Sequence, residues 1–395
     1  MYHALLEHAE QHGRQMTLVV PGSNDRYERR GRFTRIIHLR APRSPLADGR
    51  YRILLPHRFL PTGRGPLWRI LEADRPDVVE ICDKYSLCYF AGLIRKRRGH
   101  NRPALVGLSC ERMDDNVEAF VGVGAATRAV ARTVLGRVYI GMFDLHIANS
   151  EYTADELRGA MRPPHIRPIH VCSPGVDVPD RLPDDVVAAA RRDLLACCGH
   201  AEATVLLYAG RLSPEKHVLL LPRVISTLVH RTPPVHLVIA GDGPLRAQLE
   251  SDAAATVAGR IHALGHVSRE ALWRLLHACD VFVHPNPREP FGLGPLEAMA
   301  AGRPVIAPAS GGLRAYATDE NAWLCQPEAH AMASAVSACL DDPVDRRRRV
   351  IAARRTAEAH TWHAAAQRMF AQYDAVHAAS MAARAASSGV FVSAT

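Results

Sequence analysis

Short apolar runs alternate with helical patterns along most of this chain, and this alternation constrains the fold more than any other feature. In the first half the apolar runs are MTLVVPG (16–22), RPDVVEIC (75–82), RPALVGLSC (102–110) and FDLHIANS (143–150). In the second half they are VLLYAGR (205–211), VHLVIAGDG (235–243), RIHALGHV (260–267), DVFVHPN (280–286) and RPVIAPASGG (303–312). Buried short strands that alternate with helices predict parallel sheets covered on both faces. Two such series predict two doubly wound α/β domains.

The expected boundary between the domains is SPGVDVPDRLPDD (173–185), which is rich in Pro, Asp and Gly. We therefore expect a first domain over residues 1–177 and a second over 178–360. The length of 395 residues suits two domains of similar size. The small residues and serines of 381–395 predict a flexible tail.

The chain opens in a helical pattern, MYHALLEHAEQHGRQ (1–15), so its first strand is expected only at 16–20. A doubly wound domain normally opens with a strand and a Gly-rich turn, and this strand is central. We therefore expect the first domain to lack its opening strand, which leaves unpaired backbone groups in its core. Our interpretation is a start codon placed too far downstream, with upstream codons that encode an apolar strand and a glycine pair.

Cationic charge is concentrated in the first half of the chain. Residues 1–177 hold 27 Lys and Arg against 19 Asp and Glu, whereas residues 178–395 hold 22 against 21. A basic face can meet phosphorylated ligands, nucleic acid or an anionic membrane. The candidates are RKRRGHNR (95–102) with Arg128, Arg132 and Arg137, but no zinc finger, basic zipper or stacking-aromatic motif accompanies them. We therefore expect no nucleic-acid partner.

The spacing of Arg128 and Arg132, one helical turn apart among Ala and Val, suits a helix that rests on an anionic membrane. A solvated helix face explains the same spacing equally well. No apolar run reaches the roughly 18 residues that span a bilayer. Nine cysteines without regular spacing favour a reducing cytosol over a disulfide framework. We expect a cytoplasmic protein, with peripheral attachment to the inner face of the membrane left open.

The segment YAGRLSPEKHVLLL (208–221) predicts a diphosphate site, with a strand, a short polar loop and a helix that begins near Pro214. Arg211 offers a planar fork of donors and Lys216 a point charge. Both are expected where a helix N-terminus already favours an anion. The chain has three lysines, Lys84, Lys96 and Lys216, so a lysine here is unusual. The alternative is a surface loop with two solvated cations.

A second candidate site lies in REPFGLGPLEAMAAGRPVIA (288–307). Glu289 is expected on a Pro/Gly loop, and Glu297 on the early turns of a helix with Pro295 in its first turn. Carboxylates accept paired hydroxyls of the kind that ribose and hexose offer. Acids at a helix N-terminus explain Glu297 without a ligand, but they do not explain Glu289. In IAGDGPLRAQL (239–249), Gly243 allows close packing or close approach of a ligand.

These segments carry a family resemblance. GRLSPEK (210–216), IAGDGP (239–244), LGHVSREAL (264–272) and EPFGLGPLEAMAAGRPVIAPASGG (289–312), in this order, resemble the C-terminal half of retaining GT-B glycosyltransferases. This large family has two glutamates separated by seven residues and includes sucrose synthases and bacterial α-mannosyl- and α-glucosyltransferases. The resemblance implies two Rossmann-like domains that face a cleft. It also implies a nucleotide diphosphate sugar as donor, held mainly by the second domain.

The resemblance also implies roles for single residues. Arg211 and Lys216 match the positions that hold the donor diphosphate, Glu289 the one that contacts the donor sugar, and Glu297 the one that binds ribose. Further substrate-binding positions are the backbone donors Gly292 and Leu293 with their neighbour Phe291, and His266 and Val267 near the base. A helix at about 361–380 is expected to return and complete the first domain.

Two departures concern chemistry. Cys110 lies near or at a position where the family commonly has a His that contacts the donor sugar; simple packing at a strand end is the alternative. No Asp-x-Asp occurs in the sequence, so we expect neither a metal nor another cofactor, and charge neutralisation by Arg211 and Lys216. Cys197, Cys198 and His200 make a poor zinc set and are interpreted as ordinary loop residues.

The predicted activity is transfer of a hexosyl group to an unidentified sugar or lipid-linked acceptor, with retention of anomeric configuration, in cell-surface glycan or glycolipid synthesis. One alternative is a nucleotide-sugar epimerase of related fold, for which no acid/base residues can be named. The other is a catalytically inactive scaffold, suggested by the missing strand and by Cys110. The acceptor cannot be read from the sequence.

Overall fold

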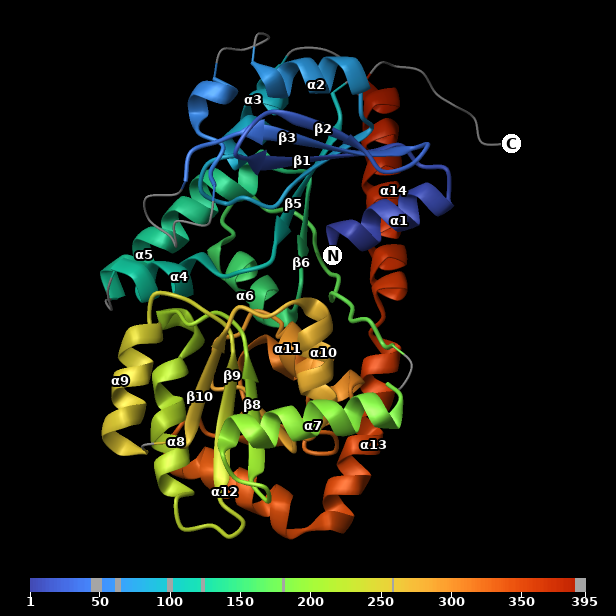
Figure 1. Cartoon of the computed structure of the whole chain (residues 1–395). Helices are drawn as coiled ribbons and strands as arrows, with labels where there is room; N and C mark the ends of the chain where they lie inside the picture. Colours follow the sequence, from blue (N-terminus) through green and yellow to red (C-terminus); the bar gives the residue numbers. More distant parts are fainter. Residues whose placement is uncertain are drawn as a thin grey trace. The chain divides into compact units, whose positions relative to one another are not determined.

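The computed structural model describes residues 1–43, 52–60, 65–97, 102–121, 125–179, 182–257 and 259–387 (Figure 1). The chain divides into two compact units. Unit 1 comprises Met1–Ser173 and Trp362–Thr395, and unit 2 comprises Pro174–Thr361. Each unit is described by itself below.

Unit 2 is built on one six-stranded parallel sheet with the strand order β10-β9-β8-β11-β12-β13. The strands are β8 (Thr204–Ala209), β9 (Val235–Ala240), β10 (Ile261–Gly265), β11 (Val281–Val283), β12 (Val305–Pro308) and β13 (Trp323–Cys325). Every residue of β9, β11 and β12 is buried. This burial explains why these strands read as continuous apolar runs.

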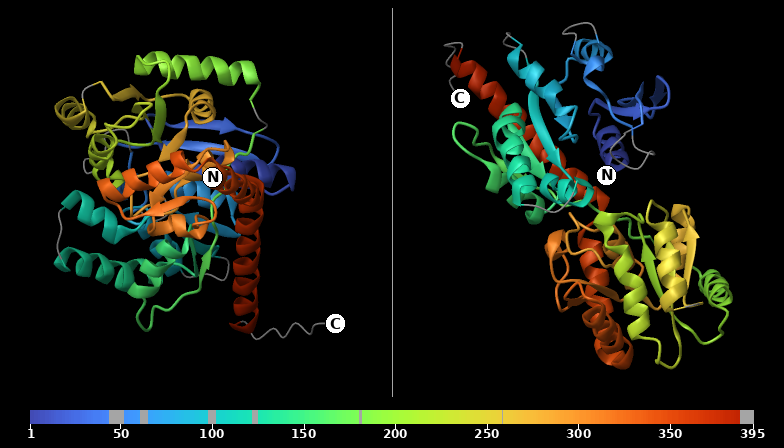
Figure 2. Two further views of the ribbon diagram at one scale, coloured as in Figure 1. Left: turned by 90° about the horizontal axis from the view of Figure 1, so that it is seen from below. Right: turned by 90° about the vertical axis from the view of Figure 1, so that its left-hand side faces the viewer.

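Helices cover both faces of the sheet of unit 2 (Figure 2). Successive side chains of β8 point to opposite faces, so Val205 and Leu207 join one core cluster and Leu206 and Tyr208 the other. The first cluster is covered by α7 (Asp184–Cys198), α10 (Arg269–Ala278), α11 (Leu293–Ala300) and α13 (Pro343–Ala359). The second is covered by α8 (Leu221–Thr227), α9 (Arg246–Thr256) and α12 (Ala329–Asp341).

Unit 1 contains two smaller sheets. One has the order β1 (Met16–Gly22), β3 (Thr34–Arg40), β2 (Arg26–Arg29), with β1 and β3 parallel and β2 antiparallel to β3. The other is parallel, with the order β4 (Val78–Ile81), β5 (Ala104–Ser109), β6 (Leu145–Ala148), β7 (Ile169–Val171). Among the described residues, no strand pairs with the edge of β1 away from β3 or with the edge of β4 away from β5. The sheet structure of unit 1 is therefore divided into two parts.

The helices of unit 1 also form two layers. One core cluster contains residues of α2 (Pro66–Asp74), α3 (Cys88–Lys96), α4 (Met113–Val121), α5 (Ala125–Val134) and α6 (Glu151–Ala160). The other joins α1 (Tyr2–Gln11) and α14 (Trp362–Ser387) to β5 and β6. Leu5 and Ala9 of α1 pack there with Met369 and Phe370 of α14.

The predicted α/β class is confirmed, and each apolar run named above coincides with a strand of the structure. The strands β2, β3, β7 and β13 lie outside these runs and were not predicted. Within the described part of the chain, no helix combines the length and the apolar character that crossing a bilayer requires.

Candidate functional site

The loops that follow β8 and β9 are joined through their backbones at the carboxyl end of the sheet. The amide of Gly210 donates to the carbonyl of Ala240 at 3.1 Å. The amide of Leu212 donates to the carbonyl of Asp242, also at 3.1 Å. Ligands of α/β folds bind at this end of parallel strands. The segments predicted to bind the donor from β8 and β9 therefore lie side by side.

Gly243 permits the contact between these two loops. A Cβ atom at Gly243 would lie 2.3 Å from the carbonyl oxygen of Leu212. A Cβ atom at Gly241 would lie 1.8 Å from the carbonyl oxygen of Gly210. These spacings admit no side chain. Of the two expectations for Gly243, the structure shows the close packing.

Lys216 does not lie at the start of an α-helix, so the expectation of a helix from near Pro214 was wrong. Pro214–Lys216 form a single 3-10 turn, and α8 begins only at Leu221. The reason is His217, whose left-handed backbone (φ 54°) interrupts the helix. The loop therefore offers the charges of Lys216 and Arg211 but not the dipole of α8, because a helix dipole acts only within the first turn of the helix.

Lys216 and Glu289 form an ion pair between the loops after β8 and β11. Lys216 Nζ donates to Glu289 Oε2 at 2.8 Å and to Oε1 at 3.1 Å. Burial opposes ionisation of Glu289, but the charge of Lys216 and the contact with His284 outweigh it, so the pKa of this carboxyl lies well below its usual range. Glu289 is therefore ionised, and Lys216 holds it in place.

Two further polar side chains on the loop after β11 contact Glu289. Asn286 Nδ2 donates to Glu289 Oε2 at 3.0 Å, and His284 Nε2 lies 3.4 Å from the same oxygen. Both side chains are buried. Neither residue was predicted from the sequence, because the run DVFVHPN (280–286) reads as a strand. The available signal was a pair of polar residues directly after a buried strand.

Arg211 lies in the same loop as Lys216. The hydroxyl of Tyr208 donates to the carbonyl of Arg211 at 3.0 Å and fixes the backbone there. Arg211 Nη1 lies 3.9 Å from Glu215 Oε1, which accepts a hydrogen bond from Ser213 Oγ. The loop therefore carries two cations, Arg211 and Lys216, each near a carboxylate.

Glu297 is in the second turn of α11. Burial raises its pKa to about 6, a shift that Arg269 reduces and Asp177 increases. A half-buried carboxylate with a raised pKa is typical of a functional site. Keeping such a group ionised lowers the stability of the folded protein.

The start of α11 is fixed by a glycine and a tyrosine. Gly292, which precedes the helix, has φ 90°, and a Cβ atom there would lie 2.9 Å from Tyr316 Oη. The same hydroxyl donates to the carbonyl of Gly292. Leu293 is the exposed first residue of the helix. Phe291 is 2% exposed and packs on the Tyr316 ring at 5.1 Å, so it supports this turn from within the core.

His266 and Val267 follow β10 at the same end of the sheet. Gly265 forms an isolated bridge with Gly241, which brings this loop to the loop after β9. His266 is exposed, whereas Val267 is half-buried against the core.

Cys110 follows β5 in unit 1. Contact with Cys82 and burial raise the pKa of its thiol above the ordinary value. Its side chain packs against the α1 and α14 core cluster. A neutral, packed thiol is a poor nucleophile.

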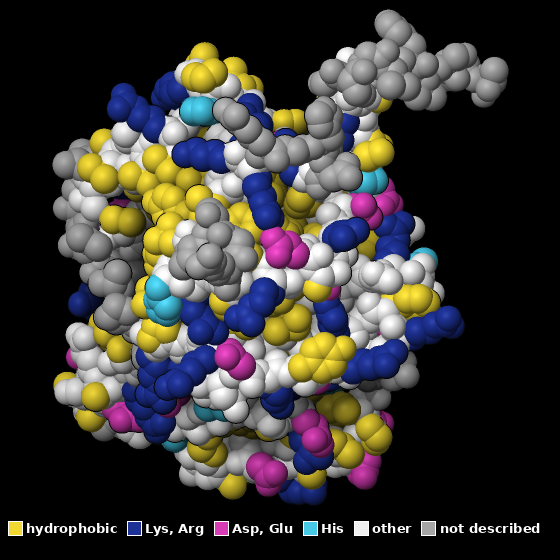
Figure 3. All heavy atoms as spheres, turned by 90° about the horizontal axis from the view of Figure 1, so that it is seen from above, with side chains coloured by type: hydrophobic (Ala, Val, Ile, Leu, Met, Phe, Trp, Pro, Cys, Tyr) yellow, Lys and Arg dark blue, Asp and Glu magenta, His cyan; other side chains and the backbone are white. Residues whose placement is uncertain are grey.

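The basic run of unit 1 is largely paired within the unit. Arg95 and Arg102 both bind Asp144, and Arg97 binds Glu72. Residues 98–101 lie outside the described part of the chain. Arg128 binds Glu118, so each of the two arginine groups proposed for an anionic surface has at least one member in an ion pair. Lys and Arg side chains are nevertheless spread among hydrophobic ones on the face in Figure 3.

A cavity of about 540 Å³, which was not predicted from the sequence, lies within unit 1. Its lining residues come from the ends of α3, α4 and α5 and the turn before α3: Lys84, Tyr85, Tyr89, Met113, Val117, Thr127, Val130, Ala131 and Val134. Lys84 pairs with Glu156 at 2.8 Å, and both side chains are buried. The remaining lining is mostly apolar.

The interpretation of Cys197, Cys198 and His200 as loop residues was wrong for the cysteines. Cys197 and Cys198 are the last residues of α7, and His200 follows the left-handed Gly199 that ends the helix. Cys197 is exposed and Cys198 is buried.

Two family models together match most of the chain. The model described as "Glycosyl transferases group 1" matches residues 200–356, and the model described as "Glycosyltransferase Family 4" matches residues 1–179. These ranges correspond to the two units.

Curated relatives match over nearly the whole length. A GDP-mannose-dependent alpha-(1-6)-phosphatidylinositol dimannoside mannosyltransferase of Mycobacterium tuberculosis is 30% identical over 372 residues, which are 92% of this chain and 88% of the relative. A GDP-mannose-dependent alpha-mannosyltransferase of the same organism is 28% identical over 94% of this chain and 91% of its own. Among solved structures, sucrose-phosphate synthase from Thermosynechococcus elongatus matches 95% of this chain and 92% of its own, with a TM-score of 0.75 and 22% identity.

Proposed function

The chain belongs to the group 1 glycosyltransferases of the GT-B fold, and from this premise we propose that it transfers mannose from GDP-mannose to a glycolipid, with retention of anomeric configuration. The donor follows from two relatives whose names specify GDP-mannose and which span most of the chain. The single observation that carries a donor site in unit 2 is the ion pair between half-buried Lys216 and buried Glu289, which lies beside Arg211.

The charges at this site suit a leaving diphosphate. Arg211 and Lys216 offset the negative charge that builds on the diphosphate as the sugar departs. Glu289 accepts hydroxyl groups of the donor sugar and orients it, while Lys216, His284 and Asn286 keep its carboxylate ionised and fixed. Because Lys216 contacts Glu289 in the free protein, one cation positions the sugar-binding carboxylate and serves the diphosphate.

The start of α11 supplies the remaining donor contacts. Glu297 accepts the ribose hydroxyls, and backbone amides at Gly292 and Leu293 face a phosphate or sugar oxygen. His266 and Val267, on the loop after β10, border the base. Gly243 and Gly292 contribute by close packing, which holds the loop after β9 and the start of α11 in place.

Transfer is proposed to be independent of a divalent cation and of any cofactor. The sequence has no Asp-x-Asp pair to hold a metal on the diphosphate. Two protein cations supply the equivalent charge.

The acceptor is proposed to bind in unit 1. The cavity of about 540 Å³ offers apolar surface with exposed tyrosines, Tyr85 and Tyr89, at its lining. Such surface suits the lipid part of an acceptor. We accordingly place the enzyme in the cytoplasm, at the inner face of the membrane.

A transfer assay tests this function. The full chain is incubated with labelled GDP-mannose and vesicles that contain phosphatidylinositol mannosides, and the labelled lipid is analysed by mass spectrometry and by NMR of the new anomeric centre. UDP-glucose serves as donor control. Absence of both transfer and GDP binding contradicts the proposal. GDP binding without transfer or donor hydrolysis favours a catalytically inactive scaffold, whereas donor hydrolysis without transfer contradicts only the acceptor.

A further inference from the structure

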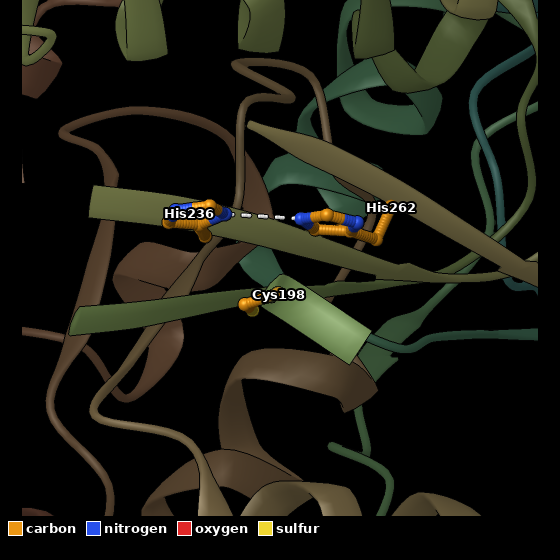
Figure 4. A group of neighbouring side chains, drawn as sticks. All are labelled: Cys198, His236 and His262. Carbon is orange, nitrogen blue, oxygen red and sulfur yellow. Dashed lines mark hydrogen bonds between the residues drawn. The ribbon is translucent and has the colours of Figure 1, made fainter. Parts of the chain in front are cut away.

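Three side chains with metal-ligating atoms converge in unit 2 on three different elements. They are Cys198 at the end of α7, His236 in β9 and His262 in β10 (Figure 4). One ligand atom of each lies within 4.8 Å of the other two. Cys198 and His236 are buried, and His262 is half-buried.

The two imidazoles already lie at a spacing close to that of two ligands of one ion. His236 Nδ1 and His262 Nε2 are 3.0 Å apart, and the two rings are nearly parallel, with an angle of 12° between their planes. Figure 4 shows the rings facing each other along this contact, with Cys198 next to them. If these two nitrogens move slightly further apart, a metal ion can bind between them in place of the proton that they share.

The donor set selects the class of metal. A thiolate with two imidazoles suits Zn²⁺, whereas Mg²⁺ and Ca²⁺ prefer oxygen ligands. His200 is the nearest additional imidazole, with its ring centroid 6.5 Å from that of His236. A tetrahedral site needs a fourth ligand, and His200 or a water molecule can supply it.

We propose that Cys198, His236 and His262 form a zinc site that fastens the end of α7 to the first residues of β9 and β10. Cys198 binds as a thiolate, and its proton passes to the solvent on binding. His236 and His262 lie near the amino ends of their strands, whereas the proposed donor loops follow the carboxyl ends. The site therefore stabilises unit 2 and takes no part in transfer, and it does not depend on the proposed function.

Metal content is the first test. The purified full chain is equilibrated with a zinc buffer, passed through a desalting column and analysed by mass spectrometry for zinc. About one zinc per chain is expected. Cys198→Ser, His236→Ala and His262→Ala should each lose it, whereas Cys197→Ser, the exposed neighbour in the same helix, should retain it. A zinc-free natural chain, or equal loss from Cys197→Ser, overturns the proposal.

Stability and spectroscopy keep the test valid if one variant folds poorly. Zinc at about a hundredfold excess over its Kd should raise Tm by roughly 5–10 °C in the natural chain, and not in His262→Ala, which is the least buried of the three. Co²⁺ should give a thiolate charge-transfer band that Cys198→Ser abolishes. If zinc leaves Tm unchanged and Co²⁺ gives no such band, the three side chains pack together without binding a metal, and the proposed zinc site is refuted.

Discussion

The two units differ in how completely the strands of their sheets are paired. In unit 2 the sheet is continuous, and β9, β8, β11 and β12 each pair on both sides. In unit 1 the sheet is divided, and β1 and β4 each present an unpaired edge among the described residues. Pairing between strands satisfies the buried backbone N–H and C=O groups without hydrogen bonds from side chains. Where two strands are not paired, hydrogen bonds from side chains have to hold the neighbouring elements together.

A half-buried carboxylate makes such a connection in unit 1. Glu80 of β4 accepts hydrogen bonds from Tyr2 of α1 and Tyr373 of α14. Burial raises the pKa of Glu80, although both tyrosine hydroxyls oppose this effect. The first helix and the last helix are therefore tied to the edge strand through one side chain. We infer that unit 1 depends on buried polar pairs more than unit 2 does.

The three lysines allow the comparison to be tested with one residue type. Lys84 pairs with Glu156 in the core of unit 1, Lys216 pairs with Glu289 at the donor loops of unit 2, and Lys96 is exposed. Lys84→Ala is expected to have the largest effect, because it leaves Glu156 charged and buried without its partner. The expected loss is about 3–5 kcal/mol of unfolding free energy, measured by urea denaturation.

Lys96→Ala is the matched control for Lys84→Ala and should change stability by less than about 0.5 kcal/mol. GDP should still bind to the folded fraction of Lys84→Ala, since the proposed donor site lies in unit 2. Loss of GDP binding with an intact fold would break the distinction between the units.

Lys216→Ala is expected to act on transfer more than on folding. The change removes a charge-assisted contact worth roughly 1.5–3 kcal/mol, so transfer should fall about tenfold to a hundredfold. Initial rates with saturating acceptor measure this, with the circular dichroism melt as a check on the fold. Unchanged turnover would remove Lys216 from the diphosphate site.

The sequence predicted the sheets of both units better than the details of the site. Apolar runs located the central strands because burial on both faces leaves a continuous signal. The strands β2, β3, β7 and β13 escaped because none of them is buried along its whole length. Three local features escaped. The left-handed His217 delays α8, and no residue type announces such a conformation in a non-glycine position. His284 and Asn286 were hidden in a run read as strand.

The cluster of Cys198, His236 and His262 escaped for a different reason. Its members come from three elements that are far apart in sequence, and only the strand order brings β9 and β10 together beside α7. The sequence showed Cys198 beside Cys197 and His200 instead. Spacing along the chain identifies metal sites only when the ligands share a loop or a helix.

Glu297→Gln should stabilise the protein while it weakens donor binding. Because the pKa is about 6 in the folded protein against 4.5 ordinarily, the carboxylate costs up to about 2 kcal/mol at neutral pH. The stabilisation from the glutamine should be full above pH 6 and disappear as pH falls through 4.5, where folded and unfolded forms are both protonated. Melting curves at several pH values measure this, and calorimetry with GDP measures the weaker binding.

Tyr373→Phe tests whether side-chain hydrogen bonds hold α1 and α14 to the edge strand β4 in unit 1. The change removes one hydroxyl donor to Glu80 and keeps the ring in place. A loss of about 1–2 kcal/mol of unfolding free energy is expected, because the acceptor is a half-buried carboxylate. Hydrogen exchange should show faster opening of β4 and α14, with β8 and β9 unchanged. Tyr27→Phe, an exposed tyrosine of β2, is the control. Equal exchange in both variants contradicts the bridging role.

Chelation is expected to have the smallest effect on transfer. If Arg211 and Lys216 alone offset the charge of the leaving diphosphate, exhaustive treatment with EDTA should leave the initial rate unchanged at temperatures well below Tm. A zinc site at Cys198 would lower Tm under the same treatment, so the rate and the melt are recorded on the same samples. Activity that disappears while Tm is unaltered, and returns with Mg²⁺ or Mn²⁺, would show that a metal serves the diphosphate. A lowered Tm with an unchanged rate instead separates the two roles within unit 2: protein cations at the carboxyl ends of its strands act on the donor, and a metal near the amino ends holds the fold.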